Sequence, residues 1–242
     1  MKRWMVLHCV LPMGMALVGG GVLVLAGVAC SSVATSGASP SREAMAKYAP
    51  ALNLRTELMI PKGQFGRKYH RPMKPTYITV HSTQSYSPNA NARTHANALK
   101  NGYLKATHNL LGYLTWHYSV DEAFVYQSLP TNERGEHADY EGPGNKKSIG
   151  IEMCENRGNS RQATVDRTAK LVAVLMVEHG IPLNHVVPHY HWERIRPKTG
   201  KNLGHKSCPH FLMDNGKPGA KWQGFLAQVD REYRKVRAGG RL

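Results

Sequence analysis

One cysteine and two histidines of this chain have side chains that bind zinc. Cys208 stands in the basic sequence Lys206-Ser207-Cys208-Pro209, which follows a histidine-rich run that starts at His189. Far upstream, His81 ends a run of β-branched and aromatic residues. One thiolate and two imidazoles make an open Zn²⁺ site, in which a fourth position is left for water or substrate. These residues predict a zinc hydrolase.

The second imidazole is not determined by spacing alone. His191 and His205 compete with His189, because each lies within reach of Cys208 along the sequence. A single histidine among the 13 of this chain is also more often a surface or core side chain than a ligand. His81 is the better placed of the set, because ligands of a catalytic zinc site are expected at strand ends and in loops.

A hydrolytic zinc centre also needs a base and a cation that stabilises an oxyanion. Glu152 is the candidate base, since it is the one acid in the apolar run from Ser148 to Cys154. Its alternative role is a buried acid paired with Arg or Lys. Lys206 is the candidate cation, and its alternative role is a solvated loop lysine.

Cys154 and Cys208 could form a disulfide if the protein is exported. Their surroundings argue for free thiols instead. Cys154 lies in an apolar strand-like run, whereas Cys208 lies in a loop rich in Lys and His, where a thiolate would be stabilised.

The elements that would carry these residues alternate irregularly between strands and helices, which predicts an α/β fold in one domain over 51–242. A strand over 76–80 delivers His81, and a strand over 148–154 carries Glu152. Apolar residues at helical spacing predict a core helix over 165–177 and a C-terminal amphipathic helix over 222–233. We also expect a helix over 90–100, a hairpin of strands 114–120 and 124–129, a long loop over 131–147 and a short strand over 185–188.

The N-terminus has the pattern of a secretory signal peptide over 1–29. Lys2 and Arg3 precede an uncharged apolar segment that ends at Cys30. Cys30 followed by two serines resembles a lipoprotein cleavage site, so we expect a lipidated Cys30 and a flexible tether over 30–50. Ordinary cleavage at the same bond, which would give a freely secreted protein, is the alternative.

The charge of the chain is strongly positive. It has 32 Lys and Arg against 16 Asp and Glu. The segment 1–29 holds two of the basic residues and none of the acids, which leaves a formal charge of 30 − 16 = +14 after cleavage. An exported protein with this charge is expected to meet anionic cell-envelope polymers or lipids. Nucleic acid is not expected, because no aromatic-rich nucleic-acid motif accompanies the charge.

Five sequence blocks of this chain resemble, in their order, those of the type-2 N-acetylmuramoyl-L-alanine amidases. These enzymes are relatives of peptidoglycan recognition proteins and of phage-type endolysin amidases. The resemblance extends from Pro75 to His210. The blocks are Tyr77-Ile78-Thr79-Val80-His81-Ser82-Thr83, Trp116-His117-Tyr118-Ser119-Val120-Asp121, Val125-Tyr126-Gln127-Ser128-Leu129-Pro130, Ser148-Ile149-Gly150-Ile151-Glu152-Met153-Cys154 and Lys206-Ser207-Cys208-Pro209-His210.

The resemblance implies a central mixed β-sheet flanked by helices, one Zn²⁺, and cleavage of the amide between the lactyl group of N-acetylmuramic acid and L-alanine of the stem peptide. It implies His81, His189 and Cys208 as ligands, because Trp192 stands three residues after His189, as in similar members. Glu152 and Lys206 match the acid and the cation that assist catalysis. Peptidoglycan or muropeptides would be the partner of a monomeric enzyme anchored at Cys30.

The chain departs from the family pattern in three places. His137 falls where many members have Trp-His-Ala in the substrate groove, but Glu136 replaces the Trp. Trp116 stands where some members carry an active-site Tyr, so packing or substrate contact is expected of it. The stretch 196–205 is longer than in compact members and could be a substrate-specific loop. A recognition module that binds without cleaving, and a zinc peptidase of the stem peptide, are the alternative functions.

Overall fold

The computed structural model describes residues 43–242. The expected signal peptide and the lipidated Cys30 lie outside the described residues. Among the described residues, no helix is both long and apolar enough to cross a membrane. The described residues all belong to one compact unit.

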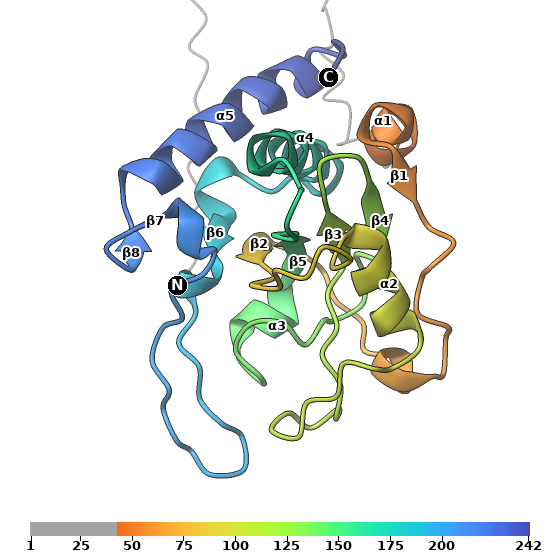
Figure 1. Ribbon diagram of the computed structural model, residues 1–242, viewed down its shortest axis with the longest axis vertical. Helices are drawn as coiled ribbons and strands as arrows, with labels where there is room; N and C mark the ends of the chain where they lie inside the picture. Colours follow the sequence, from red (N-terminus) through yellow and green to blue (C-terminus); the bar gives the residue numbers. More distant parts are fainter. Residues whose placement is uncertain (1–42) are drawn as a thin grey trace, which may run out of the picture. The chain divides into compact units, whose positions relative to one another are not determined.

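A six-stranded mixed sheet runs through the middle of this unit in the order β1-β4-β3-β5-β2-β6, as expected of the α/β class (Figure 1). All pairs of neighbouring strands are parallel except β3 and β4, which form the expected antiparallel hairpin. The strands are β1 (Leu54–Arg55), β2 (Tyr77–Ser82), β3 (Tyr118–Val120), β4 (Val125–Gln127), β5 (Ser148–Met153) and β6 (Val186–Pro188), and a separate hairpin comprises β7 (Met213–Asp214) and β8 (Lys217–Pro218).

Helices cover both faces of the sheet (Figure 1). One face carries α1 (Ala44–Leu52), α4 (Arg161–His179) and α5 (Ala220–Arg237), whose apolar side chains form the main core with the strands. The other face carries α2 (Ala92–Lys100) and the short α3 (Pro143–Lys147). The core helix predicted over 165–177 lies within α4, which begins after a Ser160 cap and ends at Gly180 with φ 65°.

Successive side chains of the two central strands, β2 and β5, point alternately to the core face and to the opposite face of the sheet. Ile78 and Val80 of β2 are fully buried against the helices of the core face, and the residue after them, His81, faces the opposite side. β5 alternates in the same way. Because β2 and β5 pair in parallel, His81 lies beside Glu152. Two residues far apart in the sequence thus meet on the face opposite the core.

The prediction of a flexible tether over 30–50 is wrong for residues 44–50. Residues 44–50 belong to α1, in which Ala44, Tyr48 and Leu52 are buried. The Tyr48 hydroxyl also donates to the Gly240 carbonyl at 2.9 Å, beyond the end of α5. Three apolar side chains at helical spacing outweigh the Ser, Ala and Pro composition of the surrounding segment.

Other boundaries also differ from the expectation. β3 is shorter than the strand predicted over 114–120, and the loop predicted over 131–147 ends in α3. No sequence pattern predicted β1, β7 or β8, each of which is two residues long. Such short strands depend on a partner elsewhere in the chain.

Candidate metal centre and active site

Three buried side chains present ligand atoms within 4.8 Å of one another: His81, His189 and Cys208. His81 lies near the end of β2, and His189 follows β6 directly. Because β2 and β6 are parallel neighbours, their carboxyl ends bring the two histidines together. The Sγ atom of Cys208 is fixed by the Ser82 N–H, which donates to it at 3.4 Å.

The second nitrogen of each histidine has a partner. Nε2 of His189 lies 3.0 Å from the Ala138 carbonyl oxygen. A carbonyl oxygen only accepts, so the proton is on Nε2 and Nδ1 carries a lone pair. Nε2 of His81 bonds Nδ1 of His137 at 3.0 Å, which leaves Nδ1 of His81 facing His189.

This arrangement fits Zn²⁺. The two Nδ1 atoms lie 2.9 Å apart, close enough to share one proton or one cation. Burial keeps both rings neutral, because it lowers the pKa of His189 to about 3 and that of His81 well below its usual value. Two neutral imidazoles and a thiol that metal binding can deprotonate are a typical zinc donor set. Burial, followed by the negative charge of Glu152, raises the pKa of the Cys208 thiol to about 12.

Glu152 lies next to these ligands and is poorly paired. Its Oε1 is 4.0 Å from Nδ1 of His81, and its side chain is 14% exposed. Its Oε2 is buried and has no hydrogen-bond partner among the described residues. Burial raises the pKa of Glu152 to about 8, against the lowering effect of the Lys206 charge. A buried carboxylate oxygen without a partner indicates a chemical role more than a structural one.

Lys206 provides positive charge at the same place. It lines the cavity that Glu152, His81 and His189 also line. It makes no ion pair within 4.0 Å with any residue of the described part of the chain. Its charge helps to lower the pKa values of both Glu152 and His189, where burial is the larger influence on each. A cation without a fixed counter-ion can respond to negative charge that develops on a substrate.

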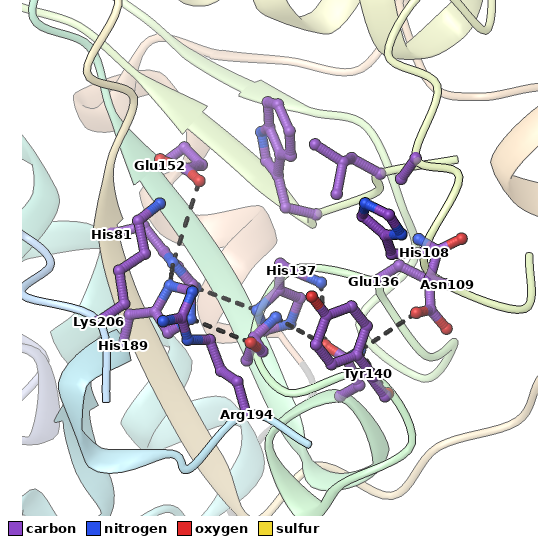
Figure 2. A pocket seen from close by; sticks show the side chains of 15 residues that line it. His81, His108, Asn109, Glu136, His137, Tyr140, Glu152, His189, Arg194 and Lys206 are labelled. Atoms are coloured by element: carbon purple, nitrogen blue, oxygen red, sulfur yellow. Dashed lines mark hydrogen bonds and ion pairs between the residues drawn. The ribbon is translucent and has the colours of Figure 1, made fainter. Parts of the chain in front are cut away.

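The cavity has a volume of about 290 Å³. In Figure 2, Glu152, His81, His189 and Lys206 lie at one end and Tyr140, His108 and Asn109 at the other. This arrangement leaves space for an extended substrate beside the candidate metal ligands.

The two residues predicted to contact substrate both line the cavity. His137, however, is also bonded to His81. The Trp116 indole donates to Ser119 Oγ at 2.8 Å and packs with Ile60 and Leu99, so most of this ring is core.

The competing histidines lie outside the ligand cluster. His191 is exposed, and its ring lies edge-on to Trp192. His205 is exposed too; it stacks on Tyr190 and bonds the Tyr190 carbonyl at 2.7 Å.

Both described cysteines are free, as expected. Cys154 is buried at the end of β5, where its Sγ lies 3.8 Å from Nδ1 of His95.

Sequence reasoning missed several residues of the site, among them Arg194 and Asn145. Arg194 lines the cavity, and its Nε and Nη2 donate to the carbonyls of Gly204 and Leu203. Asn145 is buried in α3 and bonds the backbone that leads to His137. Arg194 could have been found from its position two residues after Trp192. Nothing local marks Asn145.

Comparisons with known proteins agree with this geometry. A family model described as N-acetylmuramoyl-L-alanine amidase matches residues 71–211. The chain is 38% identical over 156 residues to the N-acetylmuramoyl-L-alanine amidase CwlH of Bacillus subtilis, a match that covers 64% of this chain and 52% of CwlH. It is 37% identical over 171 residues to the amidase XlyA of the same organism, covering 70% of this chain and 49% of XlyA. The chain thus spans about half the length of these relatives.

Solved structures give the same picture over the domain. The fold is similar to that of a mutant endolysin from Bacillus subtilis, with 38% identity, a TM-score of 0.59 and coverage of 73% of this chain and 98% of that one. It is also similar to the catalytic domain of XlyA, with 38% identity, a TM-score of 0.58 and coverage of 73% and 99%.

Proposed function

The chain belongs to the N-acetylmuramoyl-L-alanine amidase family, and from this we propose that it hydrolyses the amide between the lactyl group of N-acetylmuramic acid and L-alanine in peptidoglycan or its fragments. One observation carries the proposal for this chain. His81, His189 and Cys208 converge beside a cavity that is lined by both histidines and by Glu152, whose side chain has an unpaired carboxyl oxygen among the described residues.

The metal that suits these residues is Zn²⁺, held by His81, His189 and Cys208. When bound, it supplies Lewis acidity at the amide carbonyl and lowers the pKa of water. The Ala138 carbonyl holds His189 in the tautomer that this role requires, and His137 bonds the second nitrogen of His81 and orients that ring.

Glu152 acts as the proton carrier. It takes a proton from the attacking water as the new C–O bond forms, and it passes that proton to the L-alanine nitrogen as the C–N bond breaks. The products are a lactyl carboxylate and a peptide with a free L-alanine amine. A carboxyl group whose pKa is raised by burial is suited to both steps.

Lys206 stabilises the oxyanion. Its ammonium group lines the same cavity and has no fixed carboxylate partner among the described residues, so its charge is available to the carbonyl oxygen in the transition state.

The hairpin over 193–205 lies beside the cavity and provides basic residues that bind anionic groups of the substrate. It is the light-blue loop at the lower left of Figure 1. A bridge between Ile195 and Asn202 closes it, and Arg194 lies at its base in the cavity. Lys198 and Lys201 are exposed on it. Carboxylates of the stem peptide are the complementary groups.

Export and anchoring at Cys30 complete the proposal. The basic, then apolar N-terminal sequence supports an exported protein, and Cys30 with its two following serines supports lipidation. Incorporation of radioactive palmitate by the wild type and not by Cys30→Ser tests the anchor.

The test of the proposed function is a digest of purified peptidoglycan analysed by mass spectrometry. We expect stem peptides with an L-alanine N-terminus, abolished by a zinc chelator and restored by Zn²⁺. Tight wall binding without products would favour a recognition module, and cleavage within the stem would favour a peptidase.

A further inference from the structure

Two successive residues, His137 and Ala138, contact both histidines of the metal centre. The His137 imidazole bonds Nε2 of His81 at 3.0 Å, and the Ala138 carbonyl accepts from Nε2 of His189, also at 3.0 Å. One short backbone segment therefore sets the orientation of two ligands that come from different strands.

A single side chain, Asn145, holds this segment. Its Oδ1 accepts from the N–H groups of His137 and Ala138, at 2.9 and 2.8 Å. Its Nδ2 donates to the Tyr140 carbonyl at 2.6 Å and to Glu136 Oε2 at 3.2 Å. Asn145 is 1% exposed, and all four hydrogen-bonding positions of its amide are used. Few other side chains could supply two donors and two acceptor positions at this place.

The site of the His137 ring is also shaped for an imidazole in this orientation. A Cβ on Gly150 would lie 2.7 Å from Cδ2 of the His137 ring, and a Cβ on Gly135 would lie 2.6 Å from the same atom. Side chains at these two positions would push the ring away from His81. The glycines leave the space, and Asn145 fixes the backbone from which the ring extends.

We propose that Asn145 is a positioning residue of the metal centre, which acts on both ligand histidines through the backbone of His137 and Ala138. The inference rests on the proposed zinc site but does not depend on which bond is cleaved. Groups that hold the second nitrogen of a ligand histidine fix its tautomer and orientation, and their loss typically weakens metal affinity about 10- to 100-fold. Loss of Asn145 frees both rings at once.

The experiment compares Asn145→Ala with a matched variant, Asn159→Ala. Asn159 also makes four side-chain hydrogen bonds, to Cys154, Glu122 and Thr164, but it lies in the loop before α4 and does not line the cavity. Zinc affinity is measured by competition with a chromogenic chelator, and ligand geometry by the visible spectrum of the Co²⁺-loaded protein. Both are measured at a temperature at which circular dichroism shows each variant folded.

We expect Asn145→Ala to bind zinc about 10-fold or more weakly and to shift the Co²⁺ spectrum. Asn159→Ala should unfold at a lower temperature yet keep the affinity and spectrum of the wild type. Wild-type affinity and spectrum in Asn145→Ala would overturn the proposal, as would equal losses in both variants. A wild type that binds zinc but releases no L-alanine-terminated peptide would refute the amidase function alone.

If Asn145→Ala does not fold, the pair His137→Asn and His137→Phe tests the same segment. Asn offers an amide oxygen near the place of Nδ1, whereas Phe offers no acceptor. The proposal predicts that His137→Asn keeps more of the zinc affinity than His137→Phe, and equal affinities would contradict it.

Discussion

Nδ1 of His81 lies 2.9 Å from Nδ1 of His189, although the two residues are 108 positions apart in the chain. The parallel pairing of β2 with β6 brings them together, and bonds to His137 and Ala138 turn the two nitrogens toward each other. Such a pair of buried, neutral imidazoles favours a cation.

Replacement of Cys208 by Ser should remove zinc and activity together, because a hydroxyl is a far weaker zinc ligand than a thiolate. Metal content after dialysis and peptide release from peptidoglycan are the measurements. The control is Cys154→Ser, which changes the other buried thiol and should keep the metal. Full zinc content in Cys208→Ser would contradict the ligand assignment.

Glu152→Gln should retain zinc but lower kcat by about 100-fold or more, since an amide cannot carry the proton. The matched control is Glu178→Gln, which changes a half-buried acid of α4 whose Oε2 accepts from Met45 N. We expect Glu178→Gln to turn over like the wild type. Wall lysis by Glu152→Gln at the wild-type rate would exclude the base role.

Stability of the metal-free protein should depend on pH through Glu152. In the unfolded chain this group loses its proton near pH 4.5, whereas burial keeps it protonated in the folded protein up to about pH 8. The folded state binds more protons in this window, so this group's contribution to the free energy of unfolding falls as the pH rises.

Glu152→Gln removes this pH dependence. The Tm of the metal-free variant minus the Tm of the metal-free wild type should therefore increase between pH 4.5 and pH 8, by about 4 °C or more. The lowered pKa values of the buried histidines act equally in both proteins and cancel. Calorimetry at the two ends of the range provides the comparison, and a Tm difference that does not change with pH would refute the prediction.

The basic hairpin should act on substrate affinity and not on turnover. Replacing Lys198 and Lys201 by Gln should raise KM for peptidoglycan several-fold at low salt and leave kcat unchanged. The effect should vanish at high salt, where the Debye length shortens to about 3 Å. Arg231→Gln with Arg237→Gln removes the same charge from α5, across the sheet, and should not change KM. Equal effects from both pairs would indicate net charge alone.

Local patterns in the sequence predicted the elements that carry the ligands. The strand with His81, the strand with Glu152 and the core helix over 165–177 are all present, because alternation and helical spacing are local signals. The prediction was wrong at α1, because the composition of this segment is typical of a linker although three of its side chains are buried.

The hydrogen bonds that orient the candidate ligands could not be predicted from local sequence patterns. Asn145 bonds residues that lie seven and eight positions before it, and no repeat or spacing predicts such a contact. The hydrogen bond between His137 and His81 spans 56 positions and depends on the sheet. The candidate ligands could therefore be named from motifs, whereas the contacts that orient their side chains depend on the fold.

The most direct test of the amidase function is hydrolysis of a defined muramoyl peptide in water enriched in ¹⁸O, with Zn²⁺ present. The account predicts one ¹⁸O atom in the lactyl carboxylate of the muramic acid product and none in the peptide, which gains an L-alanine amine. Label in a carboxylate of the peptide product would show cleavage within the stem and would contradict the account.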